Sequence, residues 1–136
     1  MAILPRKGIL AITAVIDVAL YARGRPVSAK ALAARHGLPP RHLEPVLQAL
    51  VRERILKGIR GPGGGYELAR AARDVTAEEI IRAAGTVEDA DEMPKSTSPL
   101  VTDIVLPAIA DAEKAFADAL VRVNVEDMMR RAGPPA

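Results

Sequence analysis

A glycine-rich segment that begins with an arginine is the part of this chain with the clearest chemistry. Residues 60–66 read Arg-Gly-Pro-Gly-Gly-Gly-Tyr, and strand-like alternation flanks them at Ile55–Ile59 and at Tyr66–Leu68. This pattern predicts a β-hairpin whose turn is longer than two residues. Glycines at the tip let the backbone approach a ligand closely. No Lys-Ser or Lys-Thr pair follows them, so the segment is not a nucleotide-binding P-loop.

A second set of polar residues lies on a helix predicted just before this hairpin. Two prolines, Pro39 and Pro40, open the helix, which we place at Pro40–Glu53. Its apolar face consists of Leu43, Val46, Leu47, Leu50 and Val51. The side chains that lie mostly off that face are polar and can hydrogen bond to a partner, namely Arg41, His42, Glu44, Gln48 and Arg52.

The elements that position these residues follow one another as helix, turn, helix and hairpin. A first long helix is predicted over Arg6–Ala22 and a shorter one over Ala29–Arg35, with Ser28 as N-cap and Gly37 in the left-handed position after it. This order is that of a winged helix-turn-helix, whose second helix enters the major groove of DNA beside the hairpin. An arginine at the tip of such a wing, here Arg60, suits a narrow and strongly negative minor groove.

Charge is distributed unevenly, although the formal net charge is only +2. Residues 1–73 hold 13 Lys and Arg against 4 Asp and Glu, a formal charge of +9, whereas residues 74–136 hold 6 against 13, a formal charge of −7. A basic half favours a polyanionic partner; the alternative is two solvated faces of different sign. The candidates to neutralise phosphates are Lys30, Arg35, Arg52, Arg54 and Lys57.

The acidic half predicts a short helix, a loop and a long helix. Thr76 and Glu79 form a capping box for a helix through about Ala84, and the turn-rich stretch Glu88–Pro99 is expected to be a mobile acidic loop. From about Leu100 to Arg122, apolar residues recur in steps of three and four. We expect a second copy of the chain to pack against this apolar face and bury it, so that two chains form a dimer. The residues predicted to mediate dimerisation are Val105, Ile109, Ala112, Phe116, Ala119, Leu120 and Val123.

Two further expectations concern this acidic half. Pro107 must either kink the long helix or sit in its first turn. Met128 and Met129 are expected to dock against the rest of the chain.

Taken together, the predicted elements give a fold class that is mainly α with a small β-hairpin wing. We divide the chain into a DNA-binding domain at 1–84, a mobile acidic loop at 85–99, and a dimerisation helix with its tail at 100–136.

Composition narrows the functional class. With 136 residues, 49% hydrophobic and 26% charged, the chain has an ordinary globular balance. Its longest apolar stretch, Gly8–Ala22, is interrupted by Asp17 and falls short of a membrane span, so we expect neither a signal peptide nor an anchor. The chain contains no cysteine, which excludes disulfides and thiol nucleophiles. The absence of cysteine does not fix the compartment, and we expect a cytoplasmic location by default. The sequence has no paired Ser/His/Asp set, no metal-spaced His cluster and no nucleotide loop, so we expect no enzyme.

The triple glycine followed by Tyr66 and by Leu68–Ala69–Arg70 is a specific combination in this context. Together with Leu43–Glu44, Leu47, Leu50–Val51 and Ile55–Leu56, it resembles the Rrf2 family of bacterial transcription regulators. The resemblance implies a homodimer, joined mainly by the long C-terminal helix, that binds operator DNA, and we expect a repressor. We expect DNA contacts from Ser28, Lys30, Arg41, His42, Glu44, Gln48, Arg60, Gly61 and Pro62.

Three departures from the family pattern stand out. His42 occupies a position where an aromatic residue is usual, and Pro45 one where a polar, base-reading residue can occur. Well-known members hold an iron–sulfur cluster through three cysteines in the loop that here reads Glu88–Pro99. The carboxylates of this loop are hard-metal ligands in principle but lack the spacing of a calcium loop, and a solvated acidic linker is the alternative. We therefore expect no metal and no cofactor.

Two other functional classes remain open at this point. A winged helix can serve as a protein-interaction module, although the +9 charge of the first half argues against that use. The chain can also be a regulator that responds to a small molecule held between the wing domain and the long helix. No polar constellation in the sequence identifies such an effector.

Overall fold

The structure is a computed structural model that describes residues 6–87 and 99–133, except for the side chains at positions 6, 101, 102, 105, 106 and 109. Its N-terminal elements are α1 (Arg6–Tyr21), α2 (Ala29–His36), α3 (Pro40–Arg52), β1 (Leu56–Ile59) and β2 (Gly65–Leu68). A 3-10 turn η1 (Ala72–Asp74), α4 (Ala77–Ala84), a π-helical segment η2 (Leu100–Val105), α5 (Leu106–Leu120) and α6 (Val125–Ala132) follow. The predicted mainly helical fold with a small hairpin is confirmed.

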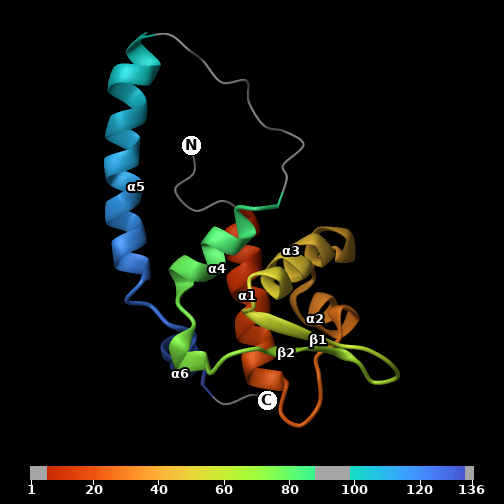
Figure 1. The fold of residues 1–136 in the computed structure, drawn as a ribbon. Coiled ribbons are helices and arrows are strands. Elements are labelled where there is room, and N and C mark those ends of the chain that lie inside the picture. The colour runs from red at the N-terminus through yellow and green to blue at the C-terminus, as the bar shows by residue number, and fades with distance from the viewer. Residues whose placement is uncertain (1–5, 88–98, 134–136) are drawn as a thin grey trace.

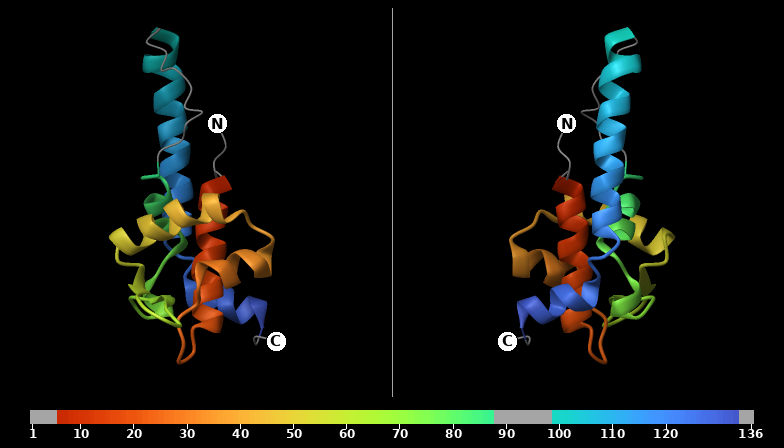
Figure 2. Two further views of the ribbon diagram at one scale, coloured as in Figure 1. Left: turned by 90° about the vertical axis from the view of Figure 1, so that its right-hand side faces the viewer. Right: turned by 90° about the vertical axis from the view of Figure 1, so that its left-hand side faces the viewer.

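Helix α1 stands at the centre and divides the molecule into two sides (Figure 1). Helices α2 and α3 and the β1–β2 hairpin lie on one side of it, and α5 and α6 lie on the other. The two further views show that α5 extends well beyond the body formed by the other elements (Figure 2). The basic first half thus supplies the elements of one side, whereas the acidic half supplies the long projecting helix.

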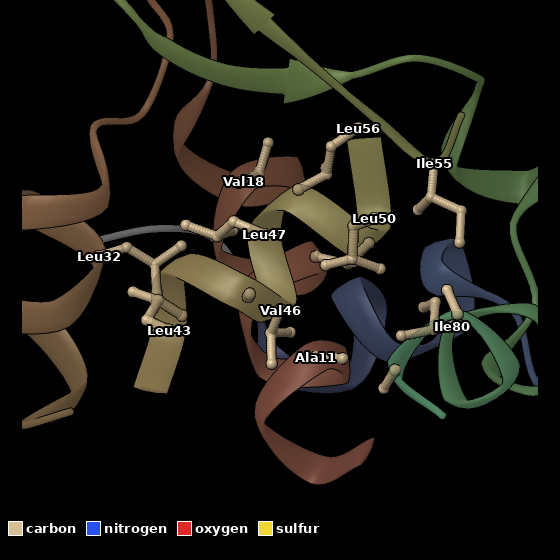
Figure 3. Packing of buried hydrophobic residues seen from close by; sticks show 14 of the residues in the cluster. Ala11, Val18, Leu32, Leu43, Val46, Leu47, Leu50, Ile55, Leu56 and Ile80 are labelled. Atoms are coloured by element: carbon tan, nitrogen blue, oxygen red, sulfur yellow. The ribbon is translucent and has the colours of Figure 1, made fainter. Parts of the chain in front are cut away.

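The core is aliphatic and is centred on α3 and α1 (Figure 3). Leu43, Leu47 and Leu50 of α3 are fully buried and pack in one cluster with Val18 of α1 and Ile80 of α4. Burial of each such side chain contributes on the order of 1.5–3 kcal/mol. These burials fix which face of α3 is turned towards the core.

The predicted helix signals are confirmed by backbone geometry. The Oγ of Ser28 accepts a hydrogen bond of 3.0 Å from the amide of Ala31, and Gly37 ends α2 in the left-handed conformation, with φ 61°. At α4, the Oγ1 of Thr76 accepts from the amide of Glu79, and the Glu79 carboxylate accepts from the amide of Thr76. These caps satisfy amides that the first helical turn leaves without partners.

The hairpin is antiparallel, and a third segment extends it. Leu56 pairs with Leu68 and Ile59 with Gly65, which leaves residues 60–64 as the turn. Val27, just before the N-cap of α2, forms a bridge with Tyr66 of β2. The wing is therefore attached by backbone hydrogen bonds to the start of the helix-turn-helix.

The long C-terminal helix begins with an irregular turn. Pro107 is the second residue of α5 and so sits in its first turn, one of the two alternatives predicted for it. The segment before it, η2, is π-helical. Proline has no amide to donate to the carbonyl four residues earlier, and that carbonyl belongs to Asp103, within η2.

Helix α6 was not predicted. Its N-cap Asn124 accepts a hydrogen bond of 2.9 Å from the amide of Asp127, and Val125 is fully buried in the core. The predicted docking of Met128 and Met129 is confirmed, because both pack against that core. Residues 125–132 thus pack with the N-terminal elements, while the domain boundaries at 84 and 99 remain predictions. None of the helices in the described ranges is long and apolar enough to span a bilayer.

Candidate nucleic-acid interface

Helix α3 has one buried and one solvent-facing side. Leu43, Val46, Leu47, Ala49 and Leu50 form the buried side. All of the polar side chains predicted to read DNA from this helix are exposed, namely Arg41, His42, Glu44 and Gln48. This partition follows from helical spacing, because residues three and four apart share a face. The helix therefore presents donors and acceptors on a surface that the core leaves free.

Pro45 lies inside α3 and faces solvent between Glu44 and Val46. Its ring nitrogen cannot donate to the carbonyl of Arg41, four residues earlier, so the first turns of α3 contain one fewer hydrogen bond than a regular helix. The amides of His42 and Leu43 both donate to the carbonyl of Pro39, at 3.1 and 3.3 Å. The backbone at the start of α3 is thus defined by Pro39 and Pro40.

The wing tip is a tight turn of defined type. The amide of Gly64 donates to the carbonyl of Gly61 at 2.9 Å, and Gly63 has φ +75°. Proline at the second position and a glycine with positive φ at the third are the requirements of a type II turn, and Pro62 and Gly63 meet them. Arg60, Gly61 and Pro62 are all exposed at this tip, as the predicted contact with DNA requires.

The next two glycines are required by steric contact. A Cβ on Gly64 would lie 2.2 Å from the carbonyl oxygen of Ile59, and a Cβ on Gly65 would lie 2.3 Å from that of Val27. Real Cβ atoms do not approach backbone oxygens so closely, so side chains are excluded at both positions. The triple glycine therefore brings the wing backbone against the segment that leads into α2.

Helix α2 contributes the residues predicted to meet the DNA backbone. Ser28 is half-buried and its Oγ accepts from the Ala31 amide, which leaves the hydroxyl hydrogen available as a donor. Lys30 is exposed in the first turn. Because Gly65 contacts Val27 and Ser28, the N-terminus of α2 lies directly beside the wing. Two of the three predicted contact regions are therefore adjacent.

A groove of about 650 Å³ runs along the exposed side of α3. Its α3 lining consists of Arg41, Glu44, Pro45, Gln48 and Arg52, and its other wall is formed by Thr86 and Val87 after α4. The Nζ of Lys7 donates to the carbonyl of Val87 at 2.8 Å, which fixes that wall to the start of α1. Three of the predicted base-reading side chains therefore share one concave surface, while His42 is not among its lining residues.

Arg35 has a partner within the protein, which the sequence did not predict. Its Nε and Nη2 donate to the two carboxylate oxygens of Asp17 at 2.8 and 2.7 Å, and its guanidinium stacks 4.1 Å from the ring centre of Tyr21. The hydrogen bond to Asp17, together with its negative charge, raises the pKa of Arg35 despite partial burial. The predicted phosphate-neutralising residues Lys30, Arg35, Arg52, Arg54 and Lys57 are all exposed. Two of them have partners within the protein, because Arg35 pairs with Asp17 and the Lys57 Nζ lies 3.6 Å from the Glu67 carboxylate.

Tyr66 connects the wing to the core. It is half-buried in β2 and packs against the core cluster, as expected. Burial raises its pKa, and the negative charge of Glu44 raises it further.

Arg70, the last residue of the Leu-Ala-Arg motif, joins the end of the wing to α4. Its Nη1 donates to the Glu79 carboxylate at 3.2 Å, and its Nε donates to the carbonyl of Arg54 at 3.3 Å. Partial burial alone would raise the pKa of Glu79. The amide of Thr76 and the guanidinium of Arg70 outweigh that effect and lower it. Arg70 thus has a structural role that the motif itself did not reveal.

The residues predicted to mediate dimerisation lie at the end of η2, on α5 and just after it. Ala112 and Ala119 are exposed, and Phe116, Leu120 and Val123 are half-buried. The side chains of Val105 and Ile109 lie outside the described part of the structure. Beside this set, Leu100 and Ile104 are 65% and 61% exposed, which is high for large apolar residues. An apolar surface on a projecting helix is typical of a protein contact.

Comparison with known proteins agrees with these features. The model of the Rrf2 family, described as iron-dependent transcriptional regulators, matches residues 4–131. An HTH-type transcriptional regulator named ORF2, from Azotobacter vinelandii, is 30% identical over 138 residues, which cover 93% of this chain and 84% of ORF2. The regulator IscR of Photorhabdus laumondii is 36% identical over 87 residues, 64% of this chain. That match covers 53% of IscR, so the comparison reaches only about half of its length.

Solved structures give the same result. IscR of T. potens has a TM-score of 0.72 at 29% identity, over 94% of this chain and 86% of its own. CymR (YrzC), the global cysteine regulator of B. subtilis, has a TM-score of 0.70 at 26% identity, over 96% of this chain and 98% of its own. The predicted winged helix-turn-helix class is thereby confirmed.

The iron dependence in the family's description does not fit this chain's ligands. The sequence contains no cysteine, so thiolates cannot hold an iron–sulfur cluster. Of its two histidines, His36 contacts the Asp17 carboxylate at 2.6 Å and His42 is exposed on α3. Among the described residues, no group of three or more His, Asp or Glu is arranged to hold a metal ion. The acidic stretch Glu88–Pro99 lies, apart from Pro99, outside the described residues.

The family model covers nearly all of the chain, and the relatives that match over it are transcriptional regulators, not enzymes. The chain belongs to the Rrf2 family of transcriptional regulators.

Proposed function

We propose that this chain acts as a homodimer that binds an operator in double-stranded DNA and represses transcription from it. The observation that carries the proposal is the exposure of Arg41, Glu44 and Gln48 along one side of α3, next to a wing with Arg60 at its tip. A guanidinium can donate to both acceptors of a guanine, and a carboxylate can accept from the amino group of cytosine. The side chains thus match the edges that a major groove presents.

The wing supplies the second part of the interaction. Arg60 follows the exposed strand residue Ile59 and directly precedes the type II turn, so it stands at the exposed tip of the wing. A narrow minor groove concentrates negative potential and attracts arginine. Ser28 and Lys30 would hold the DNA backbone between the two grooves, because backbone contacts set the register of a protein on the duplex.

Dimerisation would double these contacts and define the operator's symmetry. Two copies joined through α5 would place two α3 helices in successive major grooves, about 34 Å apart on one face of the DNA. The exposed Leu100 and Ile104 of η2, which leads into α5, support a contact along this long helical segment, because a second copy would remove their apolar surface from water. Occupancy of such a site near a promoter would block transcription, in the cytoplasm of a bacterium.

A salt titration of DNA binding tests the proposal. We expect purified protein to bind a fluorescent random duplex with an affinity that falls linearly on a log–log plot against salt, with a slope close to −0.9 per phosphate contact. The +9 charge of residues 1–73 is the source of this dependence. Absence of binding at low salt would contradict the proposal and favour a protein-interaction module.

A further inference from the structure

Among the residues that the structure describes, Asp17 is the one charged residue that is buried. It lies on the central helix α1, and its side chain is 0% exposed. All of its recorded partners come from one place, the last turn of α2. Arg35 donates to both carboxylate oxygens, at 2.8 and 2.7 Å, and His36 Nε2 lies 2.6 Å from Oδ2. We call these three residues the Asp17 clasp.

The clasp joins α1 to the turn that leads into the recognition helix. Arg35 and His36 end α2, and only Gly37, Leu38 and Pro39 separate them from α3. The C-terminus of a helix favours positive charge, so the end of α2 is itself a suitable place for these groups. The ring of Tyr21, also on α1, supports the Arg35 guanidinium from its face. The contact therefore joins α1, through Asp17 and Tyr21, to the end of α2, through Arg35 and His36.

We expect the Asp17–Arg35 ion pair to fix the orientation of α2 more than it stabilises the fold. The desolvation of a buried carboxylate offsets much of its attraction to a cation, so a buried ion pair adds little net stability. A bidentate arginine–carboxylate pair nevertheless fixes a distance and an orientation. The apolar contacts of α2 with α1 and α3 are not directional, so they leave the rotation of α2 less well defined.

We propose that the Asp17 clasp is a positioning cluster for operator recognition. It holds the α2–α3 turn at one angle to α1, and thereby sets how Arg41, His42 and Glu44, in the first turns of α3, meet the DNA bases. Arg35 acts through Asp17 and not as a neutraliser of phosphate. This inference rests on the proposed function, because it assigns specificity to residues that do not touch the bases.

The experiment uses the full-length protein, a duplex that the wild-type protein enriches from random DNA, and an unrelated duplex of equal length. Binding of each is measured by fluorescence anisotropy for Arg35→Met, Asp17→Asn and the double variant. Arg131→Met is the control, because Arg131 is exposed on α6 and its loss removes the same charge. Circular dichroism melting of each variant confirms that it is folded.

We expect Arg35→Met and Asp17→Asn each to weaken binding to the enriched duplex about tenfold or more, the effect of some 1.4 kcal/mol. Binding to the unrelated duplex should change by less than about threefold, because no phosphate contact is lost. The double variant should be little worse than either single variant, since both remove the same interaction. If Asp17→Asn does not fold, the Arg35→Met variant alone tests the inference. We expect this variant to fold, because Asp17 remains paired with His36.

Two results would overturn the inference. Folded variants with wild-type affinity for the enriched duplex would show that the clasp does not position α3. An equal loss on both duplexes, with a salt slope reduced by about one, would identify Arg35 as a phosphate contact. If the wild-type protein enriches no duplex, the proposed function fails and this inference fails with it.

Discussion

Val27 and Tyr66 exchange two backbone hydrogen bonds, of 2.9 Å from the Val27 amide and 2.8 Å from the Tyr66 amide. The residue before the N-cap of α2 is thereby joined to the second strand of the wing. As a result, the helix end predicted to hold phosphates and the wing predicted to enter the minor groove are parts of one hydrogen-bonded unit. Gly65 lies at this junction, against the carbonyl of Val27.

Replacement of Gly65 by alanine should separate the wing from α2. The new Cβ would lie 2.3 Å from the Val27 carbonyl oxygen, so the strand has to move. We expect the free energy of unfolding, measured by urea denaturation, to fall by about 1–3 kcal/mol. Gly58→Ala is the matched control in the neighbouring strand, because nothing lies within 4 Å of its Cβ position. Equal stability of the two variants would contradict this account of the junction.

Arg60→Ala should weaken binding to the operator by about 1–3 kcal/mol, because it removes the only long side chain of the wing tip. The slope of binding against salt should also become shallower by about one unit. Parallel titrations with Arg131→Ala, which removes a charge from α6, control for net charge. Unchanged operator affinity at matched salt would show that the wing does not contact DNA.

Phe116→Asp should dissociate the proposed dimer, because it would bury a charge in the apolar seam of α5. Lys114→Asp is the control, since Lys114 is exposed two positions away on the same helix and outside the seam. Sedimentation velocity should show monomers for the first variant and dimers for the second. An intact Phe116→Asp dimer would mean that the seam lies elsewhere.

Glu79 should make stability depend on pH. Its pKa is lower in the folded protein than the ordinary value of 4.5. The ionised carboxylate therefore stabilises the folded state above about pH 4.5, and this contribution is lost as the pH falls through the folded pKa. We expect Glu79→Gln to reduce the free energy of unfolding at pH 7 by about 0.5–1.5 kcal/mol, and this difference to shrink as the pH falls below the ordinary value of 4.5. A difference that persists unchanged in acid would contradict this.

The local features of the fold were predictable because their causes are close together in the sequence. Ser28 caps a helix whose amides lie three residues on, and Gly37 ends it by its own backbone conformation. The wing followed from alternation and glycine content. In each case the local capping or turn signal favours the same structure as the tertiary contacts.

The contacts that were not predicted join residues far apart in the sequence. Asp17 was visible only as a break in an apolar run, and Arg35 only as a candidate cation, because a sequence separation of 18 residues conceals the ion pair. Helix α6 did carry a signal, an Asn124 cap followed by Glu126 and Asp127, but the tail's few apolar residues obscured it. The exposed side of α3 was predicted from helical spacing, whereas the groove it shares with Thr86 and Val87 was not.

Selection of duplexes from random DNA by the purified full-length protein tests the central claim most directly. We predict that successive rounds enrich a near-palindromic sequence whose half-sites lie about one helical turn apart, because two α3 helices related by a dimer axis would read them. Enrichment should be lost with Arg41→Ala and kept with Arg131→Ala. Recovery of no common sequence, or of a single half-site bound by one chain, would contradict the account.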